Sequence, residues 1–292
     1  MFPLFTQQRT SPRYFGMSVS CQLVTFRVAA ITAAMQQKVT EAFPVYMKFL
    51  GCGDAFGSGG RLNTCFLVNR RDASFLIDCG ASAMISIRRF GVDPNGVDAI
   101  ILSHLHVDHF GGLPSFILDA QLVSRRTRPL MVAGPKGLGA RLDALMEAHF
   151  PGSTKVERKF PVELIEISPG RPVDVGSTGV CVSGFVVSHP SGTPSLALRI
   201  ECDGKILAYT GDSEWVDALL EAGRNADLLI AEAYCFDRKV RFHLDYATLR
   251  EKLPMIGAKR LILTHMSPDM LGRLSELHDC QAAYDGLEVE II

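Results

Sequence analysis

The sequence predicts an α/β fold in which β-sheets pack together inside and helices lie outside. After residue 44 the 292-residue chain contains two β-rich halves, and each half also carries helical segments. Such elements bury their apolar faces when sheets form the inner layers and helices form the outer layers. A further observation concerns function, because several of the apolar runs end directly in histidine or aspartate.

The first half alternates strands, a glycine-rich loop and helices. Residues 45–50 are typical of a strand, which breaks at the glycines of 51–60, where the backbone can adopt positive φ. Residues 98–102 form a run that is apolar after Asp98, as expected of a buried strand. Further strands are predicted at 64–68, 74–77 and 130–133, and helices at 81–90, 113–123 and 137–149.

The second half begins with several strands in succession and then alternates between helices and strands. Strands are predicted at 162–167, 180–187, 195–201, 205–209, 227–232 and 260–263, and helices at 214–222 and 246–253. No repeat, low-complexity linker or change of composition follows residue 45. We therefore expect residues 45–292 to form one domain.

The composition excludes several classes of protein. A formal net charge of −1 gives no general attraction to nucleic acid or to an anionic membrane. No apolar run reaches the roughly 18 residues that a membrane-spanning helix needs. The eight cysteines include no CxxC pair, so we expect reduced thiols and a cytoplasmic protein without membrane partners.

Residues 1–44 do not follow the pattern of the domain. The first forty residues contain Arg and Lys but no Asp or Glu, and 21–34 are mainly apolar, which weakly resembles a transit or signal peptide. The alternative is that translation starts at Met35 or Met47. In either case we expect 1–44 to be an N-terminal extension, disordered or preceding the true start.

The densest chemical signal is the segment 104–109. It contains His104, His106, Asp108 and His109, directly after the buried strand and before a predicted helix, a frequent position for sites in α/β proteins. Imidazole and carboxylate suit zinc and, less well, iron or manganese. These four side chains exceed what one tetrahedral ion with additional distant ligands requires, so the cluster predicts two ions side by side.

Three later β runs end in the same residue types, at His189, Asp212 and His265. A single histidine after a strand is usually structural. Three such events in this order, after the cluster, favour a shared metal site over a run of solvated histidines.

The order HxHxDH, His, Asp, His resembles that of the metallo-β-lactamase superfamily, over residues 47–292. The resemblance implies a four-layer αββα sandwich of two mixed β-sheets with outer helices, and a hydrolase domain at 45–292. It implies two Zn²⁺, with Mn²⁺ or Fe as alternatives. By this resemblance His104, His106 and His189 hold the first ion, Asp108, His109 and His265 hold the second, and Asp212 bridges both.

The resemblance also implies a mechanism. A metal-bridging hydroxide is the expected nucleophile, since coordination lowers the pKa of water to about 7. Asp108 and Asp212 are expected to be catalytic residues because they hold the ions that bind this hydroxide. Asp78 resembles the family's early aspartate, which supports the metal loop. The alternative is an ordinary turn residue before Gly80.

Two features narrow the subfamily: one resembles ribonuclease Z, and the other resembles the small cyclic-phosphodiesterase branch of the superfamily. Glu232 and His243 resemble a pair whose histidine protonates the leaving oxygen, although Leu244 departs from the His-Ser/Thr of ribonuclease Z. The interval between His189 and Asp212 is too short for the tRNA-clasping arm that ribonuclease Z usually inserts there. The resemblance therefore implies a small-molecule or nucleotide-type phosphodiester substrate rather than tRNA, and is compatible with a homodimer.

Weaker motifs leave alternatives open. The segment 57–61, with Arg61, could bring backbone N–H groups and a guanidinium to a phosphate, or could be a plain turn. Residues 125–128 predict a solvated basic loop, and Glu232 could be only a solvated charge. Neither His149 nor His278 stands in a ligand context.

The leading hypothesis is a zinc-dependent phosphodiesterase or related phosphoester hydrolase. Alternatives are a lactonase, thioesterase or β-lactamase-type hydrolase, a ribonuclease Z-like RNA endonuclease, and a non-catalytic ligand-binding member of the same fold. The complete set of ligand-type residues argues against the last of these.

Overall fold

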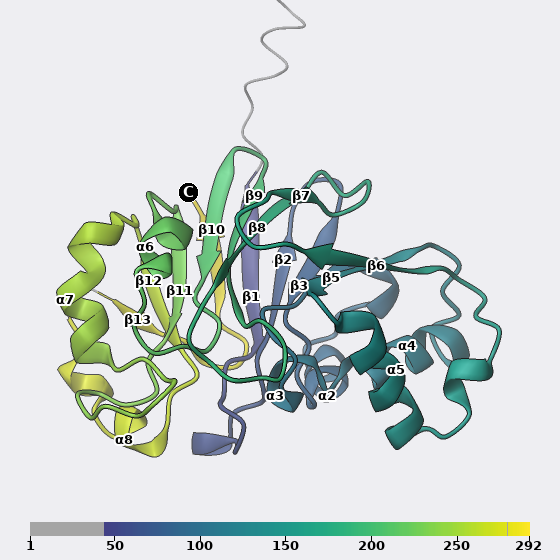
Figure 1. The fold of residues 1–292 in the computed structure, drawn as a ribbon, viewed down its shortest axis with the longest axis horizontal. Coiled ribbons are helices and arrows are strands. Elements are labelled where there is room, and N and C mark those ends of the chain that lie inside the picture. The colour runs from purple at the N-terminus through teal and green to yellow at the C-terminus, as the bar shows by residue number, and fades with distance from the viewer. Residues whose placement is uncertain (1–43, 279) are drawn as a thin grey trace, which may run out of the picture. The chain divides into compact units, whose positions relative to one another are not determined.

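Two seven-stranded β-sheets form the inner layers of the computed structural model, which describes residues 44–278 and 280–292. Their strand orders are β14-β1-β2-β3-β4-β5-β6 and β13-β12-β11-β10-β9-β8-β7. Helices cover the outer face of each sheet (Figure 1). The predicted four-layer αββα sandwich is confirmed.

The first sheet is built mainly from the N-terminal half of the domain. Its strands are β1 (Val45–Gly51), β2 (Cys65–Asn69), β3 (Ser74–Ile77), β4 (Val97–Ile101), β5 (Leu130–Pro135), β6 (Val162–Ile167) and β14 (Glu288–Ile291). Its helices are η1 (Ser58–Gly60), α2 (Ala83–Arg89), η2 (Pro94–Gly96), α3 (Val107–Phe110), α4 (Leu113–Leu122), α5 (Leu138–His149) and η3 (Ser153–Lys155).

The second sheet follows in the C-terminal half. Its strands are β7 (Val173–Asp174), β8 (Cys181–Val186), β9 (Leu196–Cys202), β10 (Lys205–Tyr209), β11 (Leu228–Glu232), β12 (Leu261–Thr264) and β13 (Gln281–Ala282). The helices are α6 (Ala218–Gly223), α7 (Tyr246–Ile256), α8 (Pro268–Leu271) and η4 (Leu274–Glu276).

The main apolar core lies between the two sheets. Phe66 of β2 contacts Phe49 of β1, with ring centroids 4.9 Å apart, and meets Tyr209 of β10 edge-on at 5.4 Å. All three rings are buried, so one aromatic cluster joins the sheets. Separate apolar clusters lie under the outer helices, with Phe116 of α4 on the first sheet and Leu249 of α7 on the second.

Parallel strands bring the site to one edge of the sandwich. Strands β3 to β6 are parallel neighbours in the first sheet, and β10 to β13 are parallel neighbours in the second. The carboxyl ends of parallel neighbours meet at the same sheet edge. The residues that follow β10 and β12 therefore lie at one edge of the second sheet, and those that follow β4 lie at one edge of the first. The two edges face each other, since His104 Nε2 lies 4.0 Å from Asp212 Oδ2.

Some elements differ from the prediction. The helix predicted at 214–222 begins only at Ala218, because the Glu214 carboxylate accepts a 2.6 Å hydrogen bond from Ser188 Oγ and holds this segment in an extended turn. The strands β7, β13 and β14 were not predicted. The predicted N-terminal extension lies outside the described residues, apart from Pro44. Within the described part of the chain, no helix is long and apolar enough to cross a membrane.

Candidate metal centre

The segment His104–His109 leaves the end of β4 and enters α3. Asp78, directly after β3, holds this loop with three hydrogen bonds: it accepts from Ser103 N and Ser103 Oγ, both at 2.8 Å, and pairs with His109 Nδ1 at 2.7 Å. The Asp78 backbone is left-handed, with φ of 57°, and its side chain is fully buried. Asp78 therefore supports the metal loop rather than serving only as a turn residue.

Gly80 fits closely under the same loop. A Cβ atom at this position would lie 2.2 Å from the carbonyl oxygen of Asp108, which is far inside van der Waals contact. The backbone of Cys79 donates to the carbonyl of His109 at 2.6 Å. Only glycine allows this close approach between the end of β3 and the loop.

Three further side chains predicted to join the site follow the ends of strands, as expected. His189 follows β8, Asp212 follows β10, and His265 follows β12. His265 has a left-handed backbone, with φ of 55°, and its N–H donates to the carbonyl of Cys52 at 3.1 Å. This conformation is uncommon for residues other than glycine, although histidine adopts it more often than most. The His265 Nε2 atom lies 3.2 Å from Asp108 Oδ2 and 3.3 Å from Asp212 Oδ2.

The seven predicted side chains form two adjacent groups. Within each group, the potential ligand atoms lie within 4.8 Å of one another. The first group consists of His104, His106 and His189, and the second of Asp108, His109, Asp212 and His265. All seven residues singled out in the sequence thus converge on one place.

Asp212 lies between the two groups. Its Oδ1 is 3.3 Å from His109 Nε2, and its Oδ2 is 3.3 Å from His265 Nε2. The same Oδ2 lies 4.0 Å from His104 Nε2 and 3.9 Å from His189 Nε2. One carboxylate is therefore within reach of histidines from both groups, as a bridging ligand requires.

Several buried polar atoms of the site have no hydrogen-bond partner within the described residues. They are His104 Nε2, His109 Nε2, Asp212 Oδ1 and His265 Nδ1. Buried polar atoms in native proteins nearly always have a partner, so four such atoms in one cluster fit the coordination of a bound ion. Imidazole nitrogens and carboxylate oxygens are the donor set that divalent transition metals take. The residues therefore fit a dinuclear metal site.

The electrostatics of the site also favour cations. Burial lowers the pKa of His109, but the carboxylates of Asp212, Asp108 and Asp78 outweigh it and raise the pKa well above its usual value. Burial alone would raise the pKa of Asp212, yet His109 and His265 hold it well below its usual value. The carboxylates that stabilise protonated His109 would also stabilise a divalent cation. Burial lowers the pKa of His104, His106 and His189, which favours the neutral imidazole that a metal ion takes as a ligand.

Beside the second group lies a buried carboxylate–imidazole pair. Glu232, at the end of β11, is fully buried, and its Oε2 lies 2.9 Å from His243 Nδ1. Burial lowers the pKa of His243, but the hydrogen bond and charge of Glu232 outweigh it and raise the pKa. A ligand-type atom of His243 lies within 4.8 Å of His189 and Asp212. Glu232 is thus no solvated charge, and His243 faces the metal cluster.

No role for Tyr234 is predicted from the sequence. Its ring stacks on His243, with centroids 4.7 Å apart and an interplanar angle of 29°. His243 is therefore held by Glu232 at one ring nitrogen and by Tyr234 across one ring face. A tyrosine two residues after a predicted strand carries no signal of its own, because the stacking depends on the loop that brings His243 back.

The glycine-rich segment 57–61 does not have its basic side chain free for a phosphate. Arg61 Nη1 donates to the carbonyl of Ala283 at 2.6 Å, and Asp54 accepts from Ser58 N at 2.9 Å. The Arg61 contact ties the loop to the C-terminal part of the chain, and the Asp54 contact closes the loop on itself, which supports its interpretation as a structural turn. His149 and His278 lie outside the groups described above.

The cluster and the facing sheets together define a class of protein: a metal-dependent hydrolase of the metallo-β-lactamase fold. Within that class, residues 45–283 match the family described as "Anti-Pycsar protein Apyc1", and the chain belongs to this family. The predicted relationship to the metallo-β-lactamase superfamily, near its ribonuclease Z branch, is confirmed by the relatives.

One such relative is ribonuclease Z of Lachnoclostridium phytofermentans, 26% identical over 265 residues, covering 76% of this chain and 87% of the relative. The metallo-β-lactamase fold protein YhfI from Bacillus subtilis has a TM-score of 0.67 at 24% identity, covering 85% of this chain and 99% of that chain. The short form of human tRNase Z has a TM-score of 0.68 at 24% identity, with the same coverage.

Proposed function

We propose that this protein is a zinc-dependent phosphodiesterase that acts on small, nucleotide-type phosphodiesters. The observation that carries the proposal is the Glu232–His243 pair beside the metal cluster. A phosphodiester with an alkoxide leaving group needs a proton in the transition state, whereas many activated esters do not. A positioned imidazole next to the metals supports the first chemistry.

The proposed ligands follow the two groups of side chains. His104, His106 and His189 would hold one ion, Asp108, His109 and His265 the other, and Asp212 both. When bound, two such ions supply Lewis acidity toward the phosphoryl group and activate water at neutral pH. Zinc is proposed because histidine and aspartate dominate the donor set, with Mn²⁺ or Fe as alternatives.

The chain's own residues would position the substrate and move the proton. The Glu232 carboxylate accepts a hydrogen bond from His243 Nδ1 and thereby fixes the tautomer and the orientation of the imidazole ring. The second ring nitrogen, Nε2, is then the atom that would donate the proton to the leaving oxygen. Tyr234 packs on the ring face and restricts its rotation.

The proposed substrate is small because the region that would hold RNA is short. Between His189 and Asp212 the chain forms only the antiparallel hairpin of β9 and β10, with a turn at Asp203 and Gly204. A net charge near zero also offers little phosphate attraction. The similarity to ribonuclease Z makes tRNA 3′-end processing the second candidate function.

A substrate panel with the purified, zinc-loaded protein tests these alternatives. We expect hydrolysis of nitrophenyl and nucleotide-type phosphodiesters, weak or no hydrolysis of lactones, thioesters and β-lactams, and weak cleavage of a precursor tRNA. Efficient tRNA processing would replace the proposal by ribonuclease Z function. Preference for lactones or thioesters would move the protein to the carbon-ester hydrolases, and binding without turnover of any compound would indicate a ligand-binding role.

A further inference from the structure

The residue before His243 has a backbone conformation that its side chain does not favour. Phe242 has φ of 68°, in the left-handed region, which bulky residues rarely adopt. His243 N donates to the carbonyl of Val240 at 3.2 Å, so Phe242 is the third residue of a four-residue turn. A positive φ at this position of a turn normally selects glycine or asparagine. A phenylalanine there requires surrounding contacts that hold it.

Two hydrogen bonds hold Phe242. Its carbonyl accepts from His189 Nδ1 at 3.0 Å, and its N–H donates to Glu214 Oε2 at 3.4 Å. The other oxygen of this carboxylate, Glu214 Oε1, accepts from Ser188 Oγ at 2.6 Å. Since Ser188 and His189 are adjacent, the turn that carries His243 is fastened to the segment that carries a proposed metal ligand.

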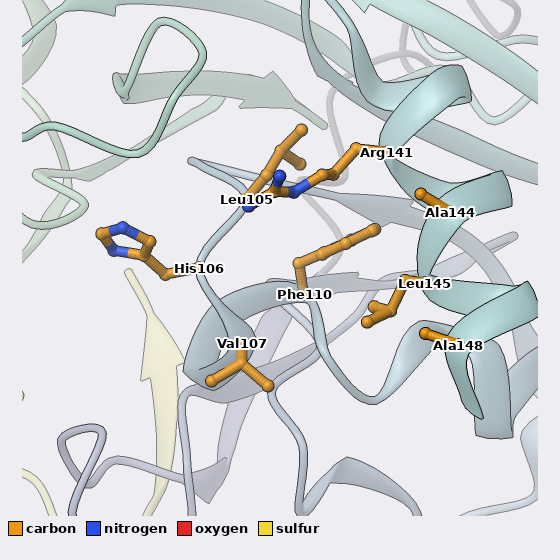
Figure 2. A pocket seen from close by; sticks show the side chains of 8 residues that line it. All are labelled: Leu105, His106, Val107, Phe110, Arg141, Ala144, Leu145 and Ala148. Atoms are coloured by element: carbon orange, nitrogen blue, oxygen red, sulfur yellow. The ribbon is translucent and has the colours of Figure 1, made fainter.

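The imidazole of His189 also faces the first ligand group. Its Nε2 lies 2.9 Å from His106 Nδ1 and 3.9 Å from Asp212 Oδ2. Figure 2 shows the His106 ring pointing away from α5 and from the cavity of about 260 Å³ between that helix and the loop after β4. The contact between His106 and His189 therefore lies on the side of this loop opposite α5.

The two ring nitrogens of His189 have different partners. A carbonyl oxygen only accepts, so Nδ1 carries the proton of the contact with Phe242, and Nε2 has a lone pair for a metal ion. The second nitrogen of a histidine ligand usually donates to such a partner, and loss of the partner lowers metal affinity. Ion binding in the first group therefore favours the Phe242 conformation, and by thermodynamic linkage this conformation favours the ion.

We infer that Phe242 is a positioning residue that couples ion binding in the first ligand group to the placement of His243. The inference rests on the proposed function for the roles of the ligands and of His243. Within residues 44–278 and 280–292, the side chains that hydrogen-bond to Phe242 are those of His189 and Glu214, and neither belongs to the second group. A protein that holds only the second ion would therefore have a misplaced proton donor.

Zinc titrations of the full chain test whether ion binding and the turn are coupled. Asp108→Ala weakens the second ligand group, so that zinc reports on the first. In this background Phe242→Asn and Phe242→Val both remove the ring, but asparagine tolerates a positive φ and the β-branched valine does not. We expect the asparagine variant to bind zinc at least about fivefold more tightly than the valine variant, as measured by competition with a chromogenic chelator.

Arg125 provides the matched control, because it is exposed and has φ of 50° in a loop outside the ligand groups. Arg125→Asn and Arg125→Val in the same background should bind zinc equally. Equal zinc affinity of the two Phe242 variants would overturn the inference, even if their unfolding temperatures differ.

Glu214→Gln tests the coupling from the other side of the turn. The amide nitrogen of glutamine cannot accept, so either Phe242 N or Ser188 Oγ loses its acceptor. We expect zinc affinity to fall about three- to tenfold, whereas Glu221→Gln on the exposed side of α6 should not change it. This comparison decides the question if Phe242→Val does not fold, and equal affinities would then overturn the inference.

Nuclear magnetic resonance of imidazole protons tests the placement of His243 itself. Its Nδ1 proton, held by Glu232, should give a downfield signal that is absent from His243→Ala. We expect zinc to sharpen this signal in Asp108→Ala, which keeps the first group, and not in His104→Ala, which keeps the second. An equal response in both variants, or a response in neither, would contradict the coupling.

These measurements involve no turnover, so they separate the inference from the proposed function. If the coupling is observed but no phosphodiester is hydrolysed, the proposed function fails and the inference stands. If diesters are hydrolysed but zinc affinity does not distinguish the two Phe242 variants, the inference fails and the proposed function stands.

Discussion

Glu232 and His243 form a buried hydrogen-bonded pair, 2.9 Å between Oε2 and Nδ1, at the side of a cluster that could hold two metal ions. Glu232 lies at the end of β11 and His243 in the loop before α7, so the pair joins two elements of the second half of the domain. This geometry gives the imidazole a fixed tautomer and direction before any substrate binds.

The effect of His243→Ala on kcat should depend on the leaving group of the substrate. On an alkyl phosphodiester, kcat should fall by about 10²–10⁴-fold, since general acid catalysis is lost. On a nitrophenyl diester the loss should be much smaller, because this leaving group departs without a proton. Steady-state kinetics on the two substrates, with metal content measured in parallel, check the prediction.

Two control variants accompany this measurement. His149→Ala removes an exposed histidine outside the cluster and should change neither rate. Asp212→Ala should impair both substrates to the same degree, since it removes the carboxylate between the two groups. Equal losses on both substrates for His243→Ala, or loss of metal from it, would show that His243 is a ligand or a structural residue.

Glu232→Gln tests the positioning role of the carboxylate. Glutamine keeps the shape and one acceptor oxygen for Ser213 N, but its amide nitrogen cannot accept from His243 Nδ1. We expect a loss of about 10–100-fold on the alkyl diester, as for other residues that orient a functional histidine, and little loss on the nitrophenyl diester. Glu163→Gln on the exposed side of β6 is the control, and an equal loss on both diesters would argue for a general structural effect.

Asp78→Asn should weaken metal binding although Asp78 is not itself a proposed ligand. Asn cannot accept all three hydrogen bonds that Asp78 receives from Ser103 and His109, so at least one buried donor loses its partner. We expect the free energy of unfolding of the metal-free protein to fall by about 1–3 kcal/mol. Zinc affinity should fall about 10–100-fold.

Urea unfolding and a competition titration with a chromogenic chelator measure these two effects. Asp143→Asn on the exposed face of α5 provides the control. Unchanged zinc affinity in Asp78→Asn would mean that the loop keeps its shape without the aspartate.

Removal of metal should lower the thermal stability of the protein. A ligand that binds only the folded state stabilises it by about 2.7 kcal/mol when its free concentration is 100 times its Kd. Dialysis against a chelator should therefore lower Tm, and zinc should restore it. In His265→Ala, zinc should raise Tm less than in the wild type, whereas a wild-type Tm that does not respond to chelator or zinc would contradict the presence of a metal site.

The sequence was most informative where local pattern and chemistry coincide. The apolar runs before His104, Asp212 and His265 are recognisable as strands by themselves. Parallel pairing brings the ends of β10 and β12 to one edge of the second sheet, whereas the approach of β4 depends on how the two sheets pack. All seven ligand-type residues could therefore be identified without coordinates. The prediction that the two sheets pack face to face rested on the resemblance and on the β-rich character of both halves.

Features that depend on distant partners were not predictable in this way. Strands β7 and β13 have two residues each, and their conformation is set by the neighbouring strand rather than by their own sequence. Arg126, expected in a solvated loop, is only 2% exposed and donates to the carbonyls of Val97, Arg128 and Pro129. A burial of this kind arises from the path of two separate backbone segments, at Val97 and at Arg128 and Pro129, around one guanidinium.

The pairing of β14 with β1 has a consequence for how the protein is made. Val45 pairs with Ile291 in an antiparallel register, so the outer strand of the first sheet comes from the opposite end of the domain. During synthesis β1 leaves the ribosome long before its partner exists, and its free edge is open to pairing with other chains. Contacts of such large sequence separation also slow folding. A product that stops short of β14 would keep this edge exposed, which makes truncated chains of this protein targets for aggregation or degradation.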